Sequence, residues 1–529
     1  MRLKQPPATQ LIQTAYAREI GDASILYEGM SLADLAHVLE LMEIGVVPQA
    51  AGGELLAALL ELHPAPPLDF GLDPARGDLY SNREAYLTML GAPVGWLSAG
   101  RARREATTLA FRLAVRTRLL ALAGGLVEFA AAALDLAEAQ RATLFPDYTY
   151  LQPAQPTTFG HYLLTFLPPV LRDLDRLRPA FNRTNASPAG SGSVNGSRLP
   201  LDRARLAARL GFDSVIPHTR DAMWQADGPI EIAALLASAL VNLDRLAEDL
   251  QIFSTTEFGL VELADRHTRS SVIMPQKKNP YSLAYVRGVC GEAIGTLAAQ
   301  AALGKTPSGQ IDNRIFAYGD VPRALEAAIA AIRLMADVLR GLAVRAEVAA
   351  RRAAEGFSGA TDLAEVIMLQ CGIDYKAAHD LVARAVSDAV ESGQTSFTLD
   401  GIEAAALASV GRRLDLSPEI LNAAVDPVRI VASRTGVGGA AEPAVVALVA
   451  EFRQALADHA AWHEAAAARL AAAEMALLMA ATALKSAPPW QSAGSPDRPD
   501  QSPPADGSQS LEDLFGDLPR PPRTRRWRG

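Results

Sequence analysis

A short loop, RSSVIMPQKKNP, gathers residue types that can carry out acid–base chemistry. It runs from Arg269 to Pro280 and holds two adjacent hydroxyls, Ser270 and Ser271, followed by two lysines and an asparagine. A serine is a poor base unless its alkoxide is stabilised, and cations lie within a few residues of both hydroxyls. The loop therefore suits removal of a proton beside a carboxylate. The competing interpretation is a solvated polar loop.

Long apolar segments with helical periodicity must position this loop. Three of them span Thr107 to Gln140, Pro229 to Phe258 and Pro322 to Glu355, while strand-like alternation is scarce. Helices that are apolar on most faces belong inside a bundle of other helices. The sequence predicts an all-α fold built around a central bundle of long helices.

Changes in composition divide the chain. Small and polar residues at 183–203 and 304–320 interrupt the helical pattern and predict loops there. We expect three domains and a tail: an N-terminal helical domain over 1–106, a central helix-bundle domain over 107–355 with a mobile catalytic loop near 266–280, a C-terminal helical domain over 356–485, and a disordered tail over 486–529. Within the tail, QSLEDLFGDL is a candidate docking segment, and a solvated tail is the alternative.

Composition excludes several classes of function. The net charge of -9 provides no basic footprint for nucleic acid. The only two cysteines, Cys290 and Cys371, lack the pattern of a disulfide framework or a metal site, which is typical of the cytoplasm. His459 and His463 have no carboxylate partner motif, so no metal is expected. No signal peptide is read, and the apolar run Leu119–Val127 is shorter than the ~20 residues of a membrane span.

Several segments, in order along the chain, resemble one known family. The loop SSVIMPQKKNP resembles the mobile-loop motif of the fumarase/aspartase superfamily, and EDLQIFSTTEFGLVELAD before it resembles the argininosuccinate lyase branch. The resemblance extends over about residues 20–455. It also includes GRARRE from Gly100, YTYLQPAQPTTFGHYLL from Tyr148, GSGSVNGSRLPLDR from Gly190, ATDLAEVIMLQCGIDYKAAHDLVARAV from Ala360 and VASRTGVGGAA from Val431.

The resemblance implies a homotetramer whose active sites are each assembled from loops of three subunits. The family's reaction is anti elimination from a dicarboxylate, usually releasing fumarate. A base takes the Cβ proton, the charge spreads into the neighbouring carboxylate, and the Cα–N bond breaks. No cofactor is expected, because the carboxylate itself is the electron sink.

Individual positions carry the resemblance further. Ser270 matches the family's catalytic serine, and Ser271 beside it is the second catalytic candidate. The predicted substrate-binding positions are Arg103, Thr149, Gln152, Lys277 and Asn279. These residues would generate and hold the carbanion.

Departures from the family pattern concern the leaving group. Tyr150 stands where the family has a histidine, and Ala284 stands where it has that histidine's glutamate partner. A phenol with a pKa of about 10 donates a proton more readily than it accepts one at neutral pH, so Tyr150 is a catalytic candidate as a donor to the leaving group. The alternative is that Tyr150 only shapes the pocket. Tyr80 also replaces a family histidine.

Two further changes bear on the substrate. Arg104 replaces an asparagine and adds a cation to the predicted binding residues, and SGQIDNRIFAYGD replaces the segment that recognises arginine. Arg314 in that segment would repel a guanidinium, which favours an anionic or neutral leaving part. We interpret the chain as an argininosuccinate lyase-like C–N lyase that acts on an N-substituted aspartate. The alternatives are a genuine argininosuccinate lyase and a non-catalytic homologue.

Overall fold

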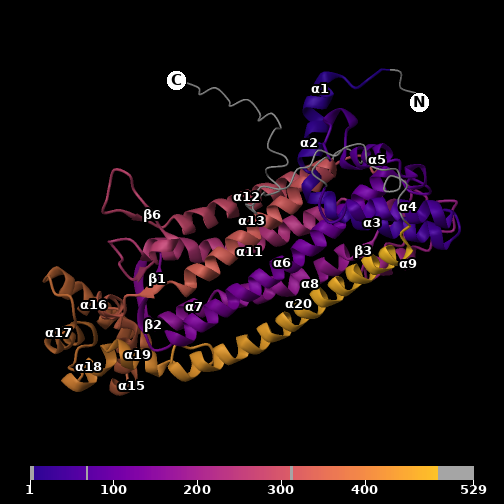
Figure 1. Cartoon of the computed structure of the whole chain (residues 1–529). Helices are drawn as coiled ribbons and strands as arrows, with labels where there is room; N and C mark the ends of the chain where they lie inside the picture. Colours follow the sequence, from indigo (N-terminus) through magenta and orange to yellow (C-terminus); the bar gives the residue numbers. More distant parts are fainter. Residues whose placement is uncertain (1–4, 67–69, 310–313, 487–529) are drawn as a thin grey trace.

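Long helices lie side by side along the whole molecule (Figure 1). The computed structural model describes residues 5–66, 70–309 and 314–486. The long helices are α6 (Arg103–Ala139), α11 (Asp227–Phe253), α12 (Tyr281–Gly304), α13 (Arg314–Arg340) and α20 (Glu442–Leu484). The predicted all-α architecture around a central bundle is confirmed.

Helix α6 forms the centre of this bundle. It packs against α13, α3 (Ala23–Glu43), α8 (Leu167–Thr184) and α20. Helix α13 in turn packs against α11. Its Leu113, Leu119 and Phe129 are buried. Each large apolar side chain removed from water contributes roughly 1.5–3 kcal/mol, so this helix needs neighbours on most of its faces.

Shorter helices form the two ends. Those of the N-terminal part are α1 (Thr9–Leu11), α2 (Ala17–Gly21), α3, α4 (Gln49–Glu61) and α5 (Leu79–Met89). Those between the long helices are α7 (Phe159–Leu164), α8, α9 (Arg203–Arg209), α10 (Thr219–Trp224) and α14 (Ala346–Ala354). At the opposite end lie α15 (Ala360–Cys371), α16 (Tyr375–Glu391), α17 (Leu399–Val410), α18 (Pro418–Val425) and α19 (Pro427–Ser433). Buried residues of α15 to α18 form a core of their own.

The strands are short and form two-stranded pairs. β1 (Leu144–Thr149) and β2 (Gln152–Thr158) make an antiparallel hairpin, and β6 (Arg269–Ser270) pairs with β7 (Lys278–Asn279). β3 (Ala186–Ser187) lies parallel to β4 (Ser214–Val215), and β5 (Val261–Glu262) pairs with β8 (Ala343–Val344). Helical periodicity gave no sign of the β1–β2 hairpin.

One expected helix is divided. The segment Pro322 to Glu355 lies partly in α13 and partly in α14, and β8 stands between them. Gly341 follows the end of α13, and a Cβ there would lie 2.9 Å from the His267 ring. The chain thus bends where a close approach requires glycine. The segment Pro229 to Phe258 is helical only as far as Phe253.

The predicted division into domains stays a prediction. The tail expected to be disordered lies, from residue 487 on, outside the described residues. Two helices, α6 and α20, are long and apolar enough to cross a membrane by length and composition alone. The apolar window of α6 is 61% buried, as in the core of a bundle, whereas that of α20 is 11% buried.

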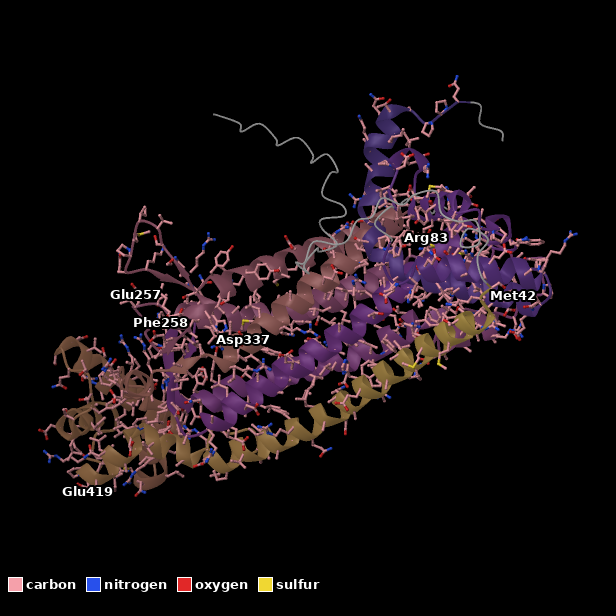
Figure 2. All side chains as sticks on the ribbon, viewed as in Figure 1. Met42, Arg83, Glu257, Phe258, Asp337 and Glu419 are labelled. Carbon is pink, nitrogen blue, oxygen red and sulfur yellow. The ribbon has the colours of Figure 1, made fainter. Side chains whose placement is uncertain are left out.

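A buried charge cluster fixes the N-terminal end of α6. Asp34 of α3 accepts from Arg83 Nη2 at 3.0 Å and from Arg101 Nη2 at 2.6 Å. All three side chains are at most 2% exposed. Arg101 lies two residues before α6, so this cluster ties the start of α6 to α3 and α5. Figure 2 shows Arg83 at this end of the molecule, far from Phe258.

We predict that Asp34→Ala strongly destabilises the fold. Removing one partner leaves two buried guanidinium groups without their anion, which costs about 3–5 kcal/mol. Chemical denaturation at one fixed protein concentration measures the loss. Asp380→Ala is the control, because its pair with Lys376 is exposed to solvent and should contribute little to stability. Equal effects of the two substitutions would contradict the structural role of Asp34.

Candidate active site

The loop that carries Ser270 is a short hairpin. Ser270 pairs with Lys278, and Arg269 with Asn279. Asn279 Nδ2 donates to the Arg269 carbonyl oxygen at 2.9 Å, and Lys278 Nζ lies 3.1 Å from Glu262 Oε1 and 2.8 Å from Asp265 Oδ1. The Asn279 amide and the Lys278 ammonium therefore hold the base of the hairpin closed. Of the two lysines, Lys277 is the one predicted to bind substrate.

The tip of this hairpin is exposed. Ser271 Oγ accepts a hydrogen bond from Met274 N at 3.1 Å, which folds the tip into a turn. Val272 is fully exposed, and Ile273 is 83% exposed. Exposure of large apolar side chains to water is unfavourable in free energy. The tip therefore exposes an apolar surface to solvent next to the two candidate serines.

The base of the hairpin is anchored in the bundle. Buried His267 has its Nε2 2.8 Å from Asp337 Oδ2 on α13. At the start of α12, Ser282 Oγ donates to the His267 carbonyl oxygen at 2.8 Å. The base of the hairpin is therefore fixed to the helices, whereas its tip is exposed.

Tyr150 lies at the tip of the β1–β2 hairpin, between Thr149 and Gln152. Tyr150 and Leu151 have φ values of 55° and 58°, in the left-handed region. Hairpin turns of this geometry favour Asn and Gly, and larger residues there cost of order 1 kcal/mol or more. Tyr150 is fully exposed within one chain. A strained tyrosine that contacts nothing in its own chain is typical of a functional position.

Aromatic packing holds this hairpin in place. Tyr148 stacks against Phe253 and Phe258, with ring centroids 5.8 Å and 5.4 Å apart. Figure 2 labels Phe258 at the end of the bundle where β1, β2 and β6 lie in Figure 1. His161, just after β2, uses both ring nitrogens, one toward Thr157 Oγ1 at 2.9 Å and one toward the Gly438 carbonyl at 3.0 Å. These two contacts tie the residue after β2 to the loop that contains Gly438.

Arg103 begins α6, at the other end of the bundle. Its Nε lies 3.2 Å from Asp78 Oδ2, and half of its side chain is exposed. Gly100, with φ of 70°, makes the turn before it, because a Cβ there would lie 2.9 Å from Ser197 Oγ. The guanidinium is paired through Nε but half exposed, and at the positive end of a helix its outer face suits a carboxylate ligand.

Arg104 is less available than the sequence suggested. Its Nη1 lies 2.9 Å from Glu19 Oε2, and its side chain is 19% exposed. The added cation is therefore balanced by an anion, which weakens the argument that it selects an anionic leaving part. Tyr80 is buried against Arg101, with the guanidinium 5.7 Å from the ring centroid. The side chain of Arg314 lies outside the described residues.

Sequence reasoning missed Glu105, the third residue of α6. It is 1% exposed, and its Oε1 accepts from Gly190 N at 2.6 Å. Burial raises the pKa of Glu105 to about 7, although the hydrogen bond from Gly190 opposes this shift. Arg203 Nε donates to the carbonyl oxygen of Ala189 at 2.9 Å, and so holds the loop that contains Gly190. The acidic residue in GRARRE was the available signal, since a carboxylate in a first helical turn is common.

The predicted site residues form two groups in one chain. Arg103 and Arg104 begin α6, whereas Thr149, Tyr150 and Gln152 follow its end. The 37 residues of α6 span about 55 Å at 1.5 Å per residue. Strand β6, which contains Ser270, lies at the same end of the bundle as β1 and β2 (Figure 1). A single chain therefore does not bring these residues around one small substrate.

Among the described residues, no group of three or more His, Cys, Asp or Glu side chains is arranged to hold a metal ion. A cavity of about 450 Å³ opens between α6, α8, α11 and α13, and its lining includes Arg112, Glu231 and Tyr318. None of the predicted site residues lines it.

Comparison with known proteins identifies the family. Residues 70–295 match the family model described as Lyase, and residues 357–432 match the model described as Argininosuccinate lyase C-terminal. The argininosuccinate lyase of Methanoculleus marisnigri is 36% identical over 439 residues, which cover 82% of this chain and 88% of the relative. That of Halobacterium salinarum is 36% identical over 449 residues, covering 83% and 90%.

The chain belongs to the argininosuccinate lyase family. Among solved structures, an EDDS lyase variant with bound fumarate is 29% identical to this lyase, with a TM-score of 0.81 and coverage of 91% and 96%. A class II fumarase from Schistosoma mansoni, 15% identical with a TM-score of 0.65, covers 81% of the lyase and 96% of its own chain, and shows the shared fold. The resemblance read from the motifs is confirmed.

We predict that Glu105 makes the stability of the lyase fall as pH rises. In the unfolded chain this carboxyl loses its proton near the ordinary value of 4.5, but in the folded chain only near a pKa of about 7. Between these values the folded state holds a proton that the unfolded state has released, so stability decreases with pH, by up to about 3 kcal/mol.

Glu105→Gln tests this, because the amide oxygen can still accept from Gly190 N. The difference in unfolding free energy between Glu105→Gln and the parent should grow from pH 4.5 to 7 in favour of the variant. A difference that is constant over this range would contradict the raised pKa.

Proposed function

We propose that this lyase breaks the Cα–N bond of an N-substituted aspartate and releases fumarate and an amine. The observation that carries the proposal is the serine and lysine hairpin within a chain of this family, together with the half-exposed Arg103 at the start of α6. Ser270 removes the Cβ proton, and Lys277, Asn279 and Arg103 hold the carboxylates as charge develops. Tyr150 donates a proton to the leaving nitrogen.

The proposed active unit is a homotetramer with sites shared between copies. The length of α6, about 55 Å, supports shared sites, because it keeps Arg103 and Tyr150 of one chain far apart. Arg103 can therefore lie next to Tyr150 only when the two residues come from different chains. The faces of α11 and α12 support assembly. Val241, Tyr285 and Ile294 are 39–51% exposed, and Gly288 and Gly291 face open space. Exposed apolar side chains beside a smooth glycine surface suit close helix packing between copies.

A second candidate is argininosuccinate itself as substrate. The 36% identity to archaeal argininosuccinate lyases favours it, and the ion pair between Arg104 and Glu19 removes one argument against a cationic leaving part. Absorbance of fumarate distinguishes the two candidates. The lyase is incubated with argininosuccinate, with other N-substituted aspartates, and with fumarate plus a panel of amines. Turnover of argininosuccinate at rates typical of enzymes would favour the second candidate; no change with any compound would favour a non-catalytic homologue.

We also propose a cytoplasmic location. Cys290 and Cys371 are both free thiols, and Cys290 is buried. A reducing compartment keeps such thiols in this state.

We predict that Ser270→Ala lowers kcat by about 10²–10⁴-fold, because it removes the base. Ser271→Ala is the matched variant, because the Ser271 hydroxyl only stabilises the turn at the tip. This substitution should lower kcat by less than about tenfold. Fumarate absorbance gives both rates, and circular dichroism checks the fold. The reverse order of the two effects would assign the base to Ser271.

We predict that Tyr150→Phe lowers kcat with little change in KM, because the phenol acts on the leaving nitrogen during bond cleavage. The effect should be about 10²-fold or more with a poor leaving amine and smaller with a good one. An unchanged kcat with all amines would leave Tyr150 only a role in pocket shape.

We predict that two inactive variants restore each other. Arg103→Ala and Ser270→Ala affect opposite ends of one chain but the same shared site. After co-refolding at equal amounts, about one quarter of the sites should carry both native residues if subunits mix at random. Either variant refolded alone is the control. A mixture as inactive as its components would contradict sites shared between copies.

A further inference from the structure

The last turns of α20 carry an apolar face that the rest of the described chain does not cover. Met475 is 64% exposed and Met479 is 67% exposed, whereas Leu477 and Ala481 on the opposite face pack against the bundle. The exposed face forms a shallow groove of about 610 Å³. Its lining consists of Ala471, Glu474, Met475, Leu478, Met479, Thr482 and Ala483.

This face has the properties of a surface that receives a helix. The lining residues recur every three or four positions, so they form one stripe along α20. Methionine side chains adapt to the shape of a bound apolar helix. From Ala471 to Ala483 the stripe is about 18 Å long. An apolar stripe of this length facing water marks a contact site.

The chain continues directly from this groove. α20 ends at Leu484, and Ser486 N donates to the Gly53 carbonyl at 3.0 Å, which ties the end of the helix to α4. The bundle therefore holds Ser486, the last described residue, close to the end of the groove.

One segment of those residues has the complementary pattern. Leu511, Leu514, Phe515 and Leu518 recur with the spacing i, i+3, i+4 and i+7, which places four apolar side chains on one face of a helix. Ser510 with Asp513 matches a capping box at the start of such a helix, and Pro519 follows its end.

We propose that residues 510–518 bind as an amphipathic helix in the α20 groove of their own chain. Nine helical residues extend about 13 Å, which fits within the 18 Å stripe. The connecting residues 487–509 have a root-mean-square reach of roughly 26 Å as a flexible linker. A reach similar to the length of the groove gives an effective concentration of the order of millimolar. The short helix thus forms on binding and covers the apolar face.

Charge opposes a second copy of the groove as the occupant. Glu512, Asp513 and Asp517 surround the apolar positions of the segment, and exposed Lys485 lies at the end of the groove. Two copies of α20 packed groove to groove would instead bring Glu474 near Glu474 of the second copy. Like charges at a desolvated contact oppose such packing.

Disulfide trapping in the full-length protein tests the proposal. Met479→Cys combined with Phe515→Cys should form a bond within one chain under mild oxidation, detected as a 479–515 peptide link in a digest. The matched control combines Phe515→Cys with Leu369→Cys, which is 77% exposed on α15 at the other end of the molecule. The groove pair should link at least about tenfold more. The single variants report any bond to Cys290 or Cys371.

Three results would overturn the proposal. One is equal linking in the groove pair and the control pair. Another is a 479–515 link found between two chains, seen as a cross-linked dimer after oxidation at low protein concentration. The third is a groove link that persists at the same level when Leu514→Asp is added, because this substitution places a charge in the apolar face of the segment.

Discussion

The length of α6 is the constraint on which the candidate site depends. A straight helix of 37 residues fixes Arg103 about 55 Å from the hairpin that follows it. Both ends are held firmly. Asp34 binds Arg101 before the helix, and the aromatic cluster around Tyr148 and Phe253 positions the strands after it. Since neither end can approach the other, a site that needs both requires copies of the chain side by side.

Two exposed features of a single chain are explained by a site that is divided between copies. Tyr150 keeps a strained left-handed backbone and touches nothing in its own chain, and Val272 and Ile273 present apolar surface beside the serines. Each would be costly in an isolated protein. In an assembly they become contacts with substrate or with a neighbouring copy. The ion pair between Arg104 and Glu19 shows, in contrast, that a cation close to Arg103 in sequence does not add a free charge to the site.

Much of this arrangement was predictable from sequence. Apolar periodicity predicted the long helices, and the SSVIMPQKKNP motif predicted the family and the serine loop. Periodicity failed at Gly341, where the close approach of His267 divides one expected helix, and at the β1–β2 hairpin, where aromatic packing overrides weak strand patterning. Glu105 and the pairing of Arg104 with Glu19 were missed because each depends on a residue 85 positions away in the chain.

A distance between copies tests the central claim most directly. In an Arg103→Cys and Gln152→Cys double variant, a short bifunctional thiol reagent cannot span α6 within one chain, but it can join the two positions where copies share a site. The account predicts covalent dimers and larger species linked through residues 103 and 152, with few such links when Leu369→Cys replaces Gln152→Cys. A double variant that keeps the assembled size of the parent lyase yet yields no 103–152 link between chains would contradict a divided site.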